Sequence, residues 1–556
     1  MVRLGALDIA IIVGYFILMV AIGIWSRRKI QNMDDYYMGG RRFGKLLMVM
    51  FGFGLGSHAD TAVGVAAQSY KIGMAGIWYQ WLHIFNIPVF WLLAAVFRRA
   101  RCLTTGDFYE KRYGPSVGIL YGTMGVIINI GYLGVMLFGS GRLIEALTGG
   151  AIPLVWSIGL MTAAFVFYSL VGGLIAAVWN DLIQGLMTVV MSFLLVPFVW
   201  SALGGAEGVR TKLPNLDTTF SLLAAGQIGL FWIVMAHINQ LVSVVAQPHV
   251  MANTAAGKRE IDGRIGFCGG AALKRFCTIA WAFVGVLAIG YYGQDSLHGD
   301  HVFGSLVRDL LPSGFSGLMI ACIMASVMDN GAAFMLTSSA LFTRNVMRGF
   351  RHGENPRREL LISRVFALIF VAGSLGLAFS FADVPAAIRF MWQLVPLIGV
   401  SFWLGLFWRR ANRYGAWASF LGSTVALLIG HYAFGWSGDA GFPKVVSFYL
   451  SAGLLCGVAV SLLTPPEAEI ELNRFFLTIH TPVGQEAKLE AFERKALASG
   501  GLATDLTERP YERVVNWQDW EIPVPDKEAI AGFFAFLGIS LALHFMLLGL
   551  CWVMRT

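Results

Sequence analysis

The sequence predicts an all-α polytopic membrane protein with about 14 transmembrane helices, and two observations support this prediction. Hydrophobic residues make up 57% of the 556 residues, and the mean hydropathy is +0.66. Charged residues make up only 13%, whereas globular proteins are about one quarter charged. Apolar runs of roughly 17 to 25 residues, the length that crosses a bilayer as a helix, recur along the chain.

The apolar runs define the predicted spans in order. The first run is too long for the core of a signal peptide and has no basic region before it, so we expect a retained helix. The second run is longer than one crossing needs, as expected of a bent or tilted helix. The expected spans are residues 7–25, 44–73, 76–97, 116–148, 152–171, 175–201, 225–248, 276–292, 314–343, 360–380, 385–408, 414–433, 445–463 and 528–554.

Lysine and arginine predict the orientation in the membrane. If the N-terminus lies outside, 32 of the 41 lysines and arginines fall in cytoplasmic segments, as the positive-inside rule requires. This distribution also accounts for the net charge of +8, so we expect no nucleic-acid partner. We therefore predict a multi-pass protein of the cell (inner) membrane. Its expected cytoplasmic segments are 26–46, 98–112, 250–275, 344–364, 409–413 and 464–527.

The sequence argues against an enzyme. Segment 464–527 is the only long polar stretch, and it contains no phosphate-binding loop, kinase signature or catalytic-triad spacing. We expect it to form a cytoplasmic cap or a linker before the last helix. The six cysteines are scattered without a metal-binding spacing, which indicates packing roles. No organic cofactor is expected.

The second span should be broken. Gly52, Gly54 and Gly56 alternate in "MVMFGFGLGSHADTAVGVAAQSYKIG", and this spacing weakens a helix on every side. Polar residues follow at once, so we expect residues 53–58 to be unwound. Unwound backbone in a membrane must line a cavity or be buried in protein, and its free carbonyl groups can bind a cation. Close helix packing at the glycines is the alternative explanation.

The seventh span is the second candidate for a break. It lies five spans after the first broken span, as expected if a five-helix unit is repeated in inverted topology. A lone histidine in such a helix is more often a satisfied core residue, but a cluster of polar residues favours a cavity. The cluster consists of His237, Asn239, Gln240, Ser243, Gln247 and Pro248.

Two acids are expected inside the membrane. Asp181 lies in "GGLIAAVWNDLIQGLMTVV", and Asp329, followed by Asn330, lies in "ACIMASVMDNGAAFMLTSSALFTRN". An acid in lipid is costly and indicates a functional site. Asp329 must therefore hold a cation, take a proton or meet a buried polar partner. We expect Asp181 and Asp329 to lie near one another, with Asp60 toward a central cavity.

Five stretches together resemble the sodium:solute symporter family over roughly residues 7–463. They are "GVAAQSYKIG" (64–73), "TTGDFYEKRYG" (104–114), "GGLIAAVWNDLIQG" (172–185), "NQLVSVVAQPHVMA" (239–252) and the stretch ending in "SSALFTRNV". The resemblance implies a LeuT-type core of two inverted five-helix repeats with extra N- and C-terminal helices. The implied units are residues 1–43, 44–201, 202–408, 409–463, 464–527 and 528–556.

The resemblance also implies a sodium site. The matching positions are the carbonyl groups near Gly54 and Ser57, the Ser326 carbonyl, and the side chains of Asp329 and Asn330. Related carriers usually have Ser or Thr at the last two positions, so this sequence departs from its family there. Asp181 matches an acid of a second ion site, whose partner hydroxyls are replaced here by Ala332 and Ala333. Asp181 is thus a possible second ion or proton site.

The implied function is sodium-coupled symport of a small polar organic solute by alternating access, with the protein acting as a monomer in the lipid bilayer. A proton-coupled carrier, a uniporter and a non-transporting sensor are the alternatives. The family spans sugars, amino acids, vitamins, amines and organic anions, so the resemblance leaves the solute open. Candidate solute-binding residues are His58, Asp60, Thr61, Trp81, His83, His237, Gln240, Trp392 and Gln393.

Overall fold

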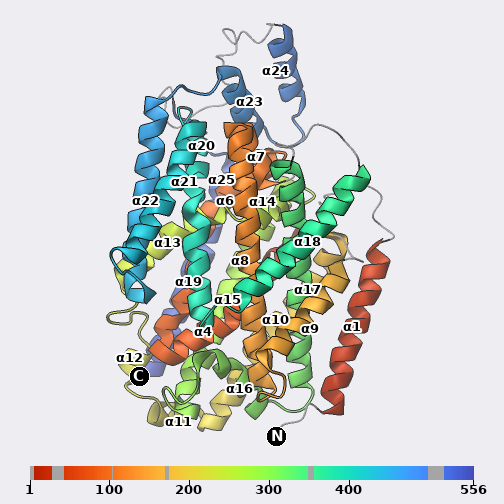
Figure 1. Cartoon of the computed structure of the whole chain (residues 1–556). Coiled ribbons are helices and arrows are strands. Elements are labelled where there is room, and N and C mark those ends of the chain that lie inside the picture. The colour runs from red at the N-terminus through yellow and green to blue at the C-terminus, as the bar shows by residue number, and fades with distance from the viewer. Residues whose placement is uncertain (1–4, 28–42, 103, 170–173, 348–355, 499–518) are drawn as a thin grey trace.

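The computed structural model describes residues 5–27, 43–102, 104–169, 174–347, 356–498 and 519–556. In these ranges the chain is almost entirely helical, and its only β-pairings are three isolated bridges. The long helices run side by side between two ends of the molecule (Figure 1). The all-α prediction is confirmed.

The first half of the chain contains the first broken helix. Its helices are α1 (Ala6–Arg27), α3 (Lys45–Gly54), α4 (Ala59–Ile72), η2 (Gly73–Ile77), α5 (Trp78–Trp81), α6 (Ile87–Arg99), α7 (Thr105–Tyr113), α8 (Pro115–Leu147), α9 (Leu154–Ser169) and α10 (Leu174–Leu203).

The second half contains the second broken helix and the peripheral helices. Its helices are α11 (Gly205–Lys212), α12 (Leu216–Thr219), α13 (Leu230–Val244), α14 (Pro248–Ala255), α15 (Glu260–Tyr292), α16 (Gly299–Leu310), α17 (Phe315–Leu341), η3 (Phe342–Val346), α18 (Pro356–Ala378), α19 (Val384–Leu394), η5 (Val395–Leu397), α20 (Gly399–Phe407), α21 (Arg413–Tyr432), α22 (Gly438–Leu463), α23 (Glu469–His480), α24 (Ala487–Ala498) and α25 (Lys527–Arg555).

Several helices are long and apolar enough to cross a membrane. Among the described residues there are seven, or nine if each of two bent pairs counts as one span. Shorter apolar stretches lie in α1, α9 and α18. The protein is therefore a multi-pass helical membrane protein, while the count of 14 spans stays a prediction.

The predicted break in the second span is confirmed, but Phe53 and Gly54, which were expected to be unwound, still belong to α3. Helix α3 ends at Gly54, α4 begins at Ala59, and the two helices differ in direction by 58°. The helical pattern continues as far as Leu55, and short-range bonds from Gly56 N to the Phe53 carbonyl and from Ser57 N to the Gly54 carbonyl then close the turn. The seventh span is also bent, by 63° between α13 and α14.

Most of the predicted cytoplasmic segment 250–275 is helical rather than a loop, while its position outside the membrane stays a prediction. Helix α14 extends to Ala255, and α15 begins at Glu260, 16 residues before the expected start of the eighth span. Because this region contains several charged residues, its hydropathy is too low to indicate a membrane-spanning helix. Much of the predicted segment 26–46, and parts of 344–364 and 464–527, lie outside the described residues.

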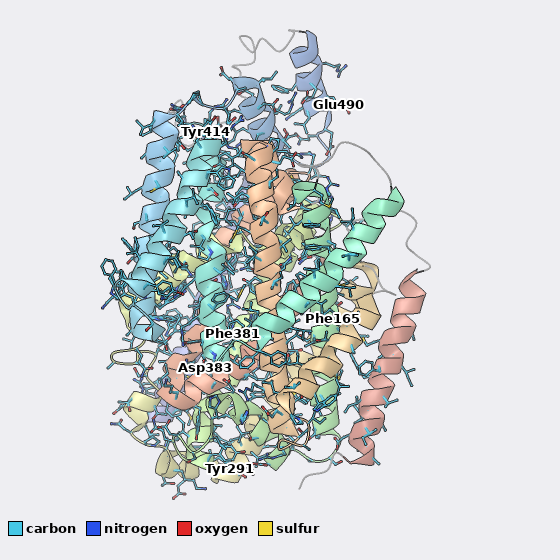
Figure 2. The ribbon with its side chains drawn as sticks, in the orientation of Figure 1. Phe165, Tyr291, Phe381, Asp383, Tyr414 and Glu490 are labelled. Atoms are coloured by element: carbon cyan, nitrogen blue, oxygen red, sulfur yellow. The ribbon has the colours of Figure 1, made fainter. Side chains whose placement is uncertain are left out.

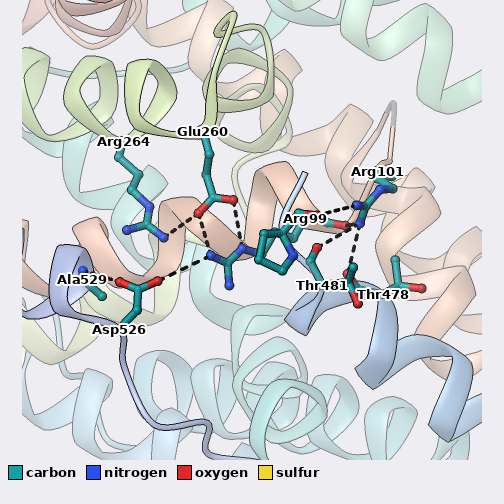
Figure 3. Close-up of polar contacts among 9 residues, drawn as sticks. Arg99, Arg101, Glu260, Arg264, Thr478, Thr481, Asp526 and Ala529 are labelled. Atoms are coloured by element: carbon teal, nitrogen blue, oxygen red, sulfur yellow. Dashed lines mark hydrogen bonds and ion pairs between the residues drawn. The ribbon is translucent and has the colours of Figure 1, made fainter. Parts of the chain in front are cut away.

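A network of polar contacts explains why charged residues are tolerated at the start of α15 (Figure 3). Arg99 donates to both carboxylate oxygens of Glu260, at 2.9 and 2.8 Å, and Arg264 donates to the same carboxylate at 2.6 Å. Arg101 donates to the carbonyl groups of Thr478 and Thr481. These contacts fix α23 and the end of α6 to the core.

Helices α23 and α24, which lie in the chain between α22 and α25, form one end of the molecule. Helices α11 and α16 and the C-terminal end of α25 lie at the opposite end (Figure 1). Tyr291, at the end of α15, is correspondingly far from Tyr414 and Glu490 (Figure 2). Helix α25 ends with Arg555 donating to the Phe220 carbonyl at 2.8 Å.

Helix α15 packs closely against α4 at a glycine. A Cβ atom added to Gly285 would lie 2.5 Å from the Ala66 carbonyl oxygen, a backbone atom that cannot move aside. Only glycine permits this approach between the two helices.

We predict that Gly285→Ala lowers the apparent melting temperature of the purified protein by several degrees, because overpacking a core contact destabilises by roughly 1–3 kcal/mol. Gly376→Ala is the control, since nothing lies within 4 Å of the added Cβ there. Equal melting temperatures for the two variants in detergent would contradict the described packing.

Candidate ion and solute site

A cavity of about 190 Å³ lies beside the first break. Six of the predicted solute-binding residues line it, and they come from the break, the start of α4, the turn between α5 and α6, and helices α13 and α19. They are His58, Asp60, Thr61, His83, Gln240 and Trp392. Their contact with a solute stays a prediction.

Three other predicted residues do not line this cavity. Trp81 is fully buried and its Nε1 donates to the Arg275 carbonyl at 3.0 Å. His237 uses Nδ1 to contact the Ile233 carbonyl at 2.8 Å, and Gln393 pairs with His431 at 2.9 Å. These residues lie in the predicted spans, but on sides of their helices that face other partners.

Polar side chains stabilise the break itself. His58 Nε2 lies 3.0 Å from the Leu55 carbonyl oxygen, and the Thr61 hydroxyl donates to the His58 carbonyl at 2.6 Å. His58 Nδ1 also lies 3.4 Å from Asp60 Oδ1. The same residues therefore satisfy the freed backbone and form part of the cavity wall.

Two basic residues of the cavity wall were not predicted from the sequence. Lys274 and Arg275 lie near the middle of α15 and line the cavity, and Lys274 Nζ donates to the Gly56 carbonyl. A signal was available: the predicted span 276–292 has only 17 residues, the lower limit for a crossing. Extending it toward the N-terminus would have brought both cations into the membrane. Gln80, Tyr132 and His249 were missed as well.

The residues predicted to bind ions converge on the other side of the break. A Cβ atom added to Gly54 would lie 2.1 Å from Asp181 Oδ1, so Asp181 contacts the end of α3 directly. Asp181 and Asp329 are within hydrogen-bonding reach of each other. Asn330 Nδ2 donates to the Ser326 carbonyl at 3.0 Å and reaches the Gly54 carbonyl at 3.5 Å.

Several buried oxygen atoms in and near this group accept no hydrogen bond from an N–H or hydroxyl group of the described residues. They are Ser57 Oγ, Asp181 Oδ1, Ser326 Oγ, Asp329 Oδ1 and Asn330 Oδ1. A hard cation prefers such oxygen ligands. Two neighbouring buried carboxylates also repel each other unless a cation or a proton lies between them. The donor set is thus suited to a sodium ion, and the acid pair is suited to a proton.

A multi-pass helical protein whose broken helices meet buried acids and a polar cavity belongs to the class of membrane transporters. The model of the sodium:solute symporter family matches residues 36–422. The chain belongs to this family, and it is a sodium-coupled symporter rather than an enzyme.

Relatives of known activity are similar over most of their length. The chain is 24% identical to sodium/glucose cotransporter 4 of Danio rerio, over 92% of this chain and 87% of the relative. It is 25% identical to the osmoregulated proline transporter OpuE of Bacillus subtilis (strain 168), over 84% of this chain and 98% of the relative. It is also 25% identical to a sodium/pantothenate symporter of Haemophilus influenzae, over 72% of this chain and 86% of the relative.

Solved structures show the same fold. A Na⁺-coupled sialic acid symporter in a substrate-bound outward-open state superposes with a TM-score of 0.71, at 19% identity, over 84% of this chain and 99% of that chain. Mhp1, a nucleobase-cation-symport-1 family transporter, superposes with a TM-score of 0.53 at 12% identity, over 83% of this chain and 99% of that chain.

Two glycines of the break allow a matched test of the ion site. Gly54→Ala forces Asp181 away from the end of α3, whereas in Gly56→Ala the nearest atom to the added Cβ is 3.7 Å away. We predict that sodium chloride raises the melting temperature of the wild type and of Gly56→Ala relative to choline chloride at equal ionic strength, because a bound ion stabilises the folded state. Gly54→Ala should lose this increase, and its retention would contradict an ion site next to Asp181.

Proposed function

We propose that this chain imports a small polar organic solute together with sodium across the cell (inner) membrane. In this proposal it acts as a monomer of 14 spans, with the N-terminus outside and segment 464–527 in the cytoplasm. Residues 44–201 and 202–408 form the two inverted repeats, and residues 1–43, 409–463 and 528–556 add peripheral helices. The placement of α23 and α24 opposite the end of α25 supports this orientation (Figure 1).

One observation supports the proposed coupling most directly: the two halves of the candidate site share the break between α3 and α4. Gly54 lies against Asp181, and Ser57 lines a small cavity together with Ser326. His58 and Asp60, one to three residues later, line the solute cavity. An ion that fixes the break therefore acts on the cavity wall, and a coupling of this kind is reciprocal.

The shape of the cavity supports an inward-facing state. Its lining includes Met48 of α3 and Asn253 and Thr254 of α14, and α14 lies in the half of the molecule that holds α23 (Figure 1). On the opposite side, the Tyr79 hydroxyl donates to Asp439 Oδ1 at 2.5 Å, and Arg389 lies 3.4 Å from the same oxygen. This cluster ties α5, α19 and α22 together and, in our proposal, keeps the outer path closed.

The names of the relatives support sodium and a small solute without selecting one. Relatives carry glucose, myo-inositol, proline or pantothenate in their names, and the sialic acid symporter has a similar fold. A second candidate, proton coupling, is favoured by a single observation, the contact between Asp181 and Asp329. Two carboxyl groups in contact can share one proton.

The role of Asp329 separates these candidates. A thermal-shift screen of the purified protein against solutes, with and without sodium, first identifies a ligand. Uptake into proteoliposomes is then measured under separate sodium and pH gradients. We predict that the sodium gradient drives uptake, that Asp329→Ala abolishes sodium dependence, and that Asp329→Ser restores part of it by supplying a hydroxyl ligand.

Asp217→Ala, which removes an exposed acid of α12, is the control and should behave as the wild type. Uptake driven by a pH gradient without sodium, and lost in Asp329→Asn, would establish the proton alternative. Sodium-driven uptake that is undiminished in Asp329→Ala would reject an ion ligand at this position.

A further inference from the structure

The wall of the solute cavity has an excess of positive charge. Lys274 and Arg275 both line it, whereas Asp60 is the only acid among its described lining residues. The wall also contains three histidines, His58, His83 and His249, which cannot offset this positive charge. With neutral histidines the cavity therefore has a net charge of about +1, counted at pH 7 from ordinary side-chain pKa values.

The charge of Arg275 is not paired with an acid among the described residues. The residue is only 3% exposed, and its Nε and Nη1 atoms are buried and donate to none of those residues. No ion pair to Arg275 occurs in the part of the chain that the structure describes, and its carbonyl group, not its guanidinium, bonds to Trp81. A buried guanidinium without a partner is costly, so a residue of this kind at a cavity wall indicates a ligand.

Asp60 can compensate at most one of the two cations. Its Oδ1 lies 3.4 Å from His58 Nδ1, while Lys274 directs its Nζ to the Gly56 carbonyl. Asp60 acts on Lys274 electrostatically but forms no ion pair with it among the described contacts. One of the two cations is therefore left for the contents of the cavity.

We propose that the solute is a small organic anion, a monocarboxylate, whose carboxylate group binds to Arg275 with help from Lys274. This inference rests on the proposed transport function and names its solute class. A planar guanidinium can donate two parallel hydrogen bonds to a carboxylate. Such a solute offsets the excess positive charge of the cavity wall, to which Arg275 contributes.

The rest of the wall fits the organic part of such a solute. Side-chain amides of Gln80 and Gln240 can bind hydroxyl or carbonyl groups, and the rings of Phe334 and Trp392 offer apolar surface. A cavity of about 190 Å³ suits a small molecule rather than a polymer.

The test compares carboxylates with their own amides, which have nearly the same shape but no charge. Purified wild-type protein in sodium chloride is titrated with propionate, lactate, nicotinate and benzoate, and with propionamide, lactamide, nicotinamide and benzamide, and the melting temperature is recorded. We expect at least one carboxylate to raise the melting temperature where its amide does not. Arg275→Gln should weaken binding of that carboxylate by at least about tenfold. Arg210→Gln, at an exposed arginine of α11, should bind it as the wild type does.

The apo form of Arg275→Gln provides a measurement that needs no ligand. Because the variant removes an uncompensated buried charge, its melting temperature without solute should equal or exceed that of the wild type. A clear decrease would show that Arg275 is a structural residue and would overturn the proposal.

Other results would also overturn the proposal. One is stronger stabilisation by a neutral or cationic solute than by any carboxylate, and another is equal binding of a carboxylate and its amide. The third is a melting temperature that is higher in chloride than in sulfate and that no carboxylate raises further. If sodium drives a neutral solute into proteoliposomes, only the proposal that the solute is an anion would be rejected. Failure of sodium to drive any bound solute would reject the transport proposal itself.

Discussion

The carbonyl groups freed between α3 and α4 are the constraint on which this structure depends. Lipid offers no hydrogen-bond donors, so interrupted backbone within a membrane protein must find them inside the protein. Four side chains serve this break: Asn330 reaches the Gly54 carbonyl, His58 contacts the Leu55 carbonyl, Lys274 donates to the Gly56 carbonyl, and Thr61 donates to the His58 carbonyl. The break is therefore held by α15 and α17 as well as by its own residues.

This arrangement places two kinds of chemistry on either side of one short segment. On one side are the acids of α10 and α17, whose Oδ1 atoms accept no hydrogen bond from the residues that the structure describes. On the other side is a cavity with two basic residues from α15. The candidate cation site and the candidate solute cavity therefore have opposite charge preferences and lie next to each other, so in our proposal occupation of one changes the electrostatic environment of the other.

The sequence was sufficient to predict the fold class, the break and the proximity of Asp181 and Asp329, because each depends on a strong local signal. Alternating glycines weaken a helix, and acids in apolar runs have to face the protein interior. The direction in which an individual side chain points was harder to predict. Trp81 and His237 lie on predicted elements but point to other partners, since neighbouring positions on a helix differ by about 100° in direction.

Lys274 and Arg275 could not be placed from hydropathy, because their charges ended the predicted span and assigned them to a loop. Their place inside α15 follows from contacts that are distant in sequence, such as the Lys274 contact with Gly56. The position of Glu260 has a similar origin, since its partner Arg99 is 161 residues away. Tertiary pairing of charges therefore decided what local composition could not.

We infer that sodium acts on the segment between α3 and α4. Hydrogen–deuterium exchange of the protein in lipid nanodiscs, measured by mass spectrometry with sodium or potassium at equal ionic strength, can detect this action. We predict that sodium slows exchange of the amides of residues 55–61 and that Asp329→Ala loses this protection. Exchange in this segment that is the same in both salts, with sodium protection only elsewhere in the chain, would contradict the claim.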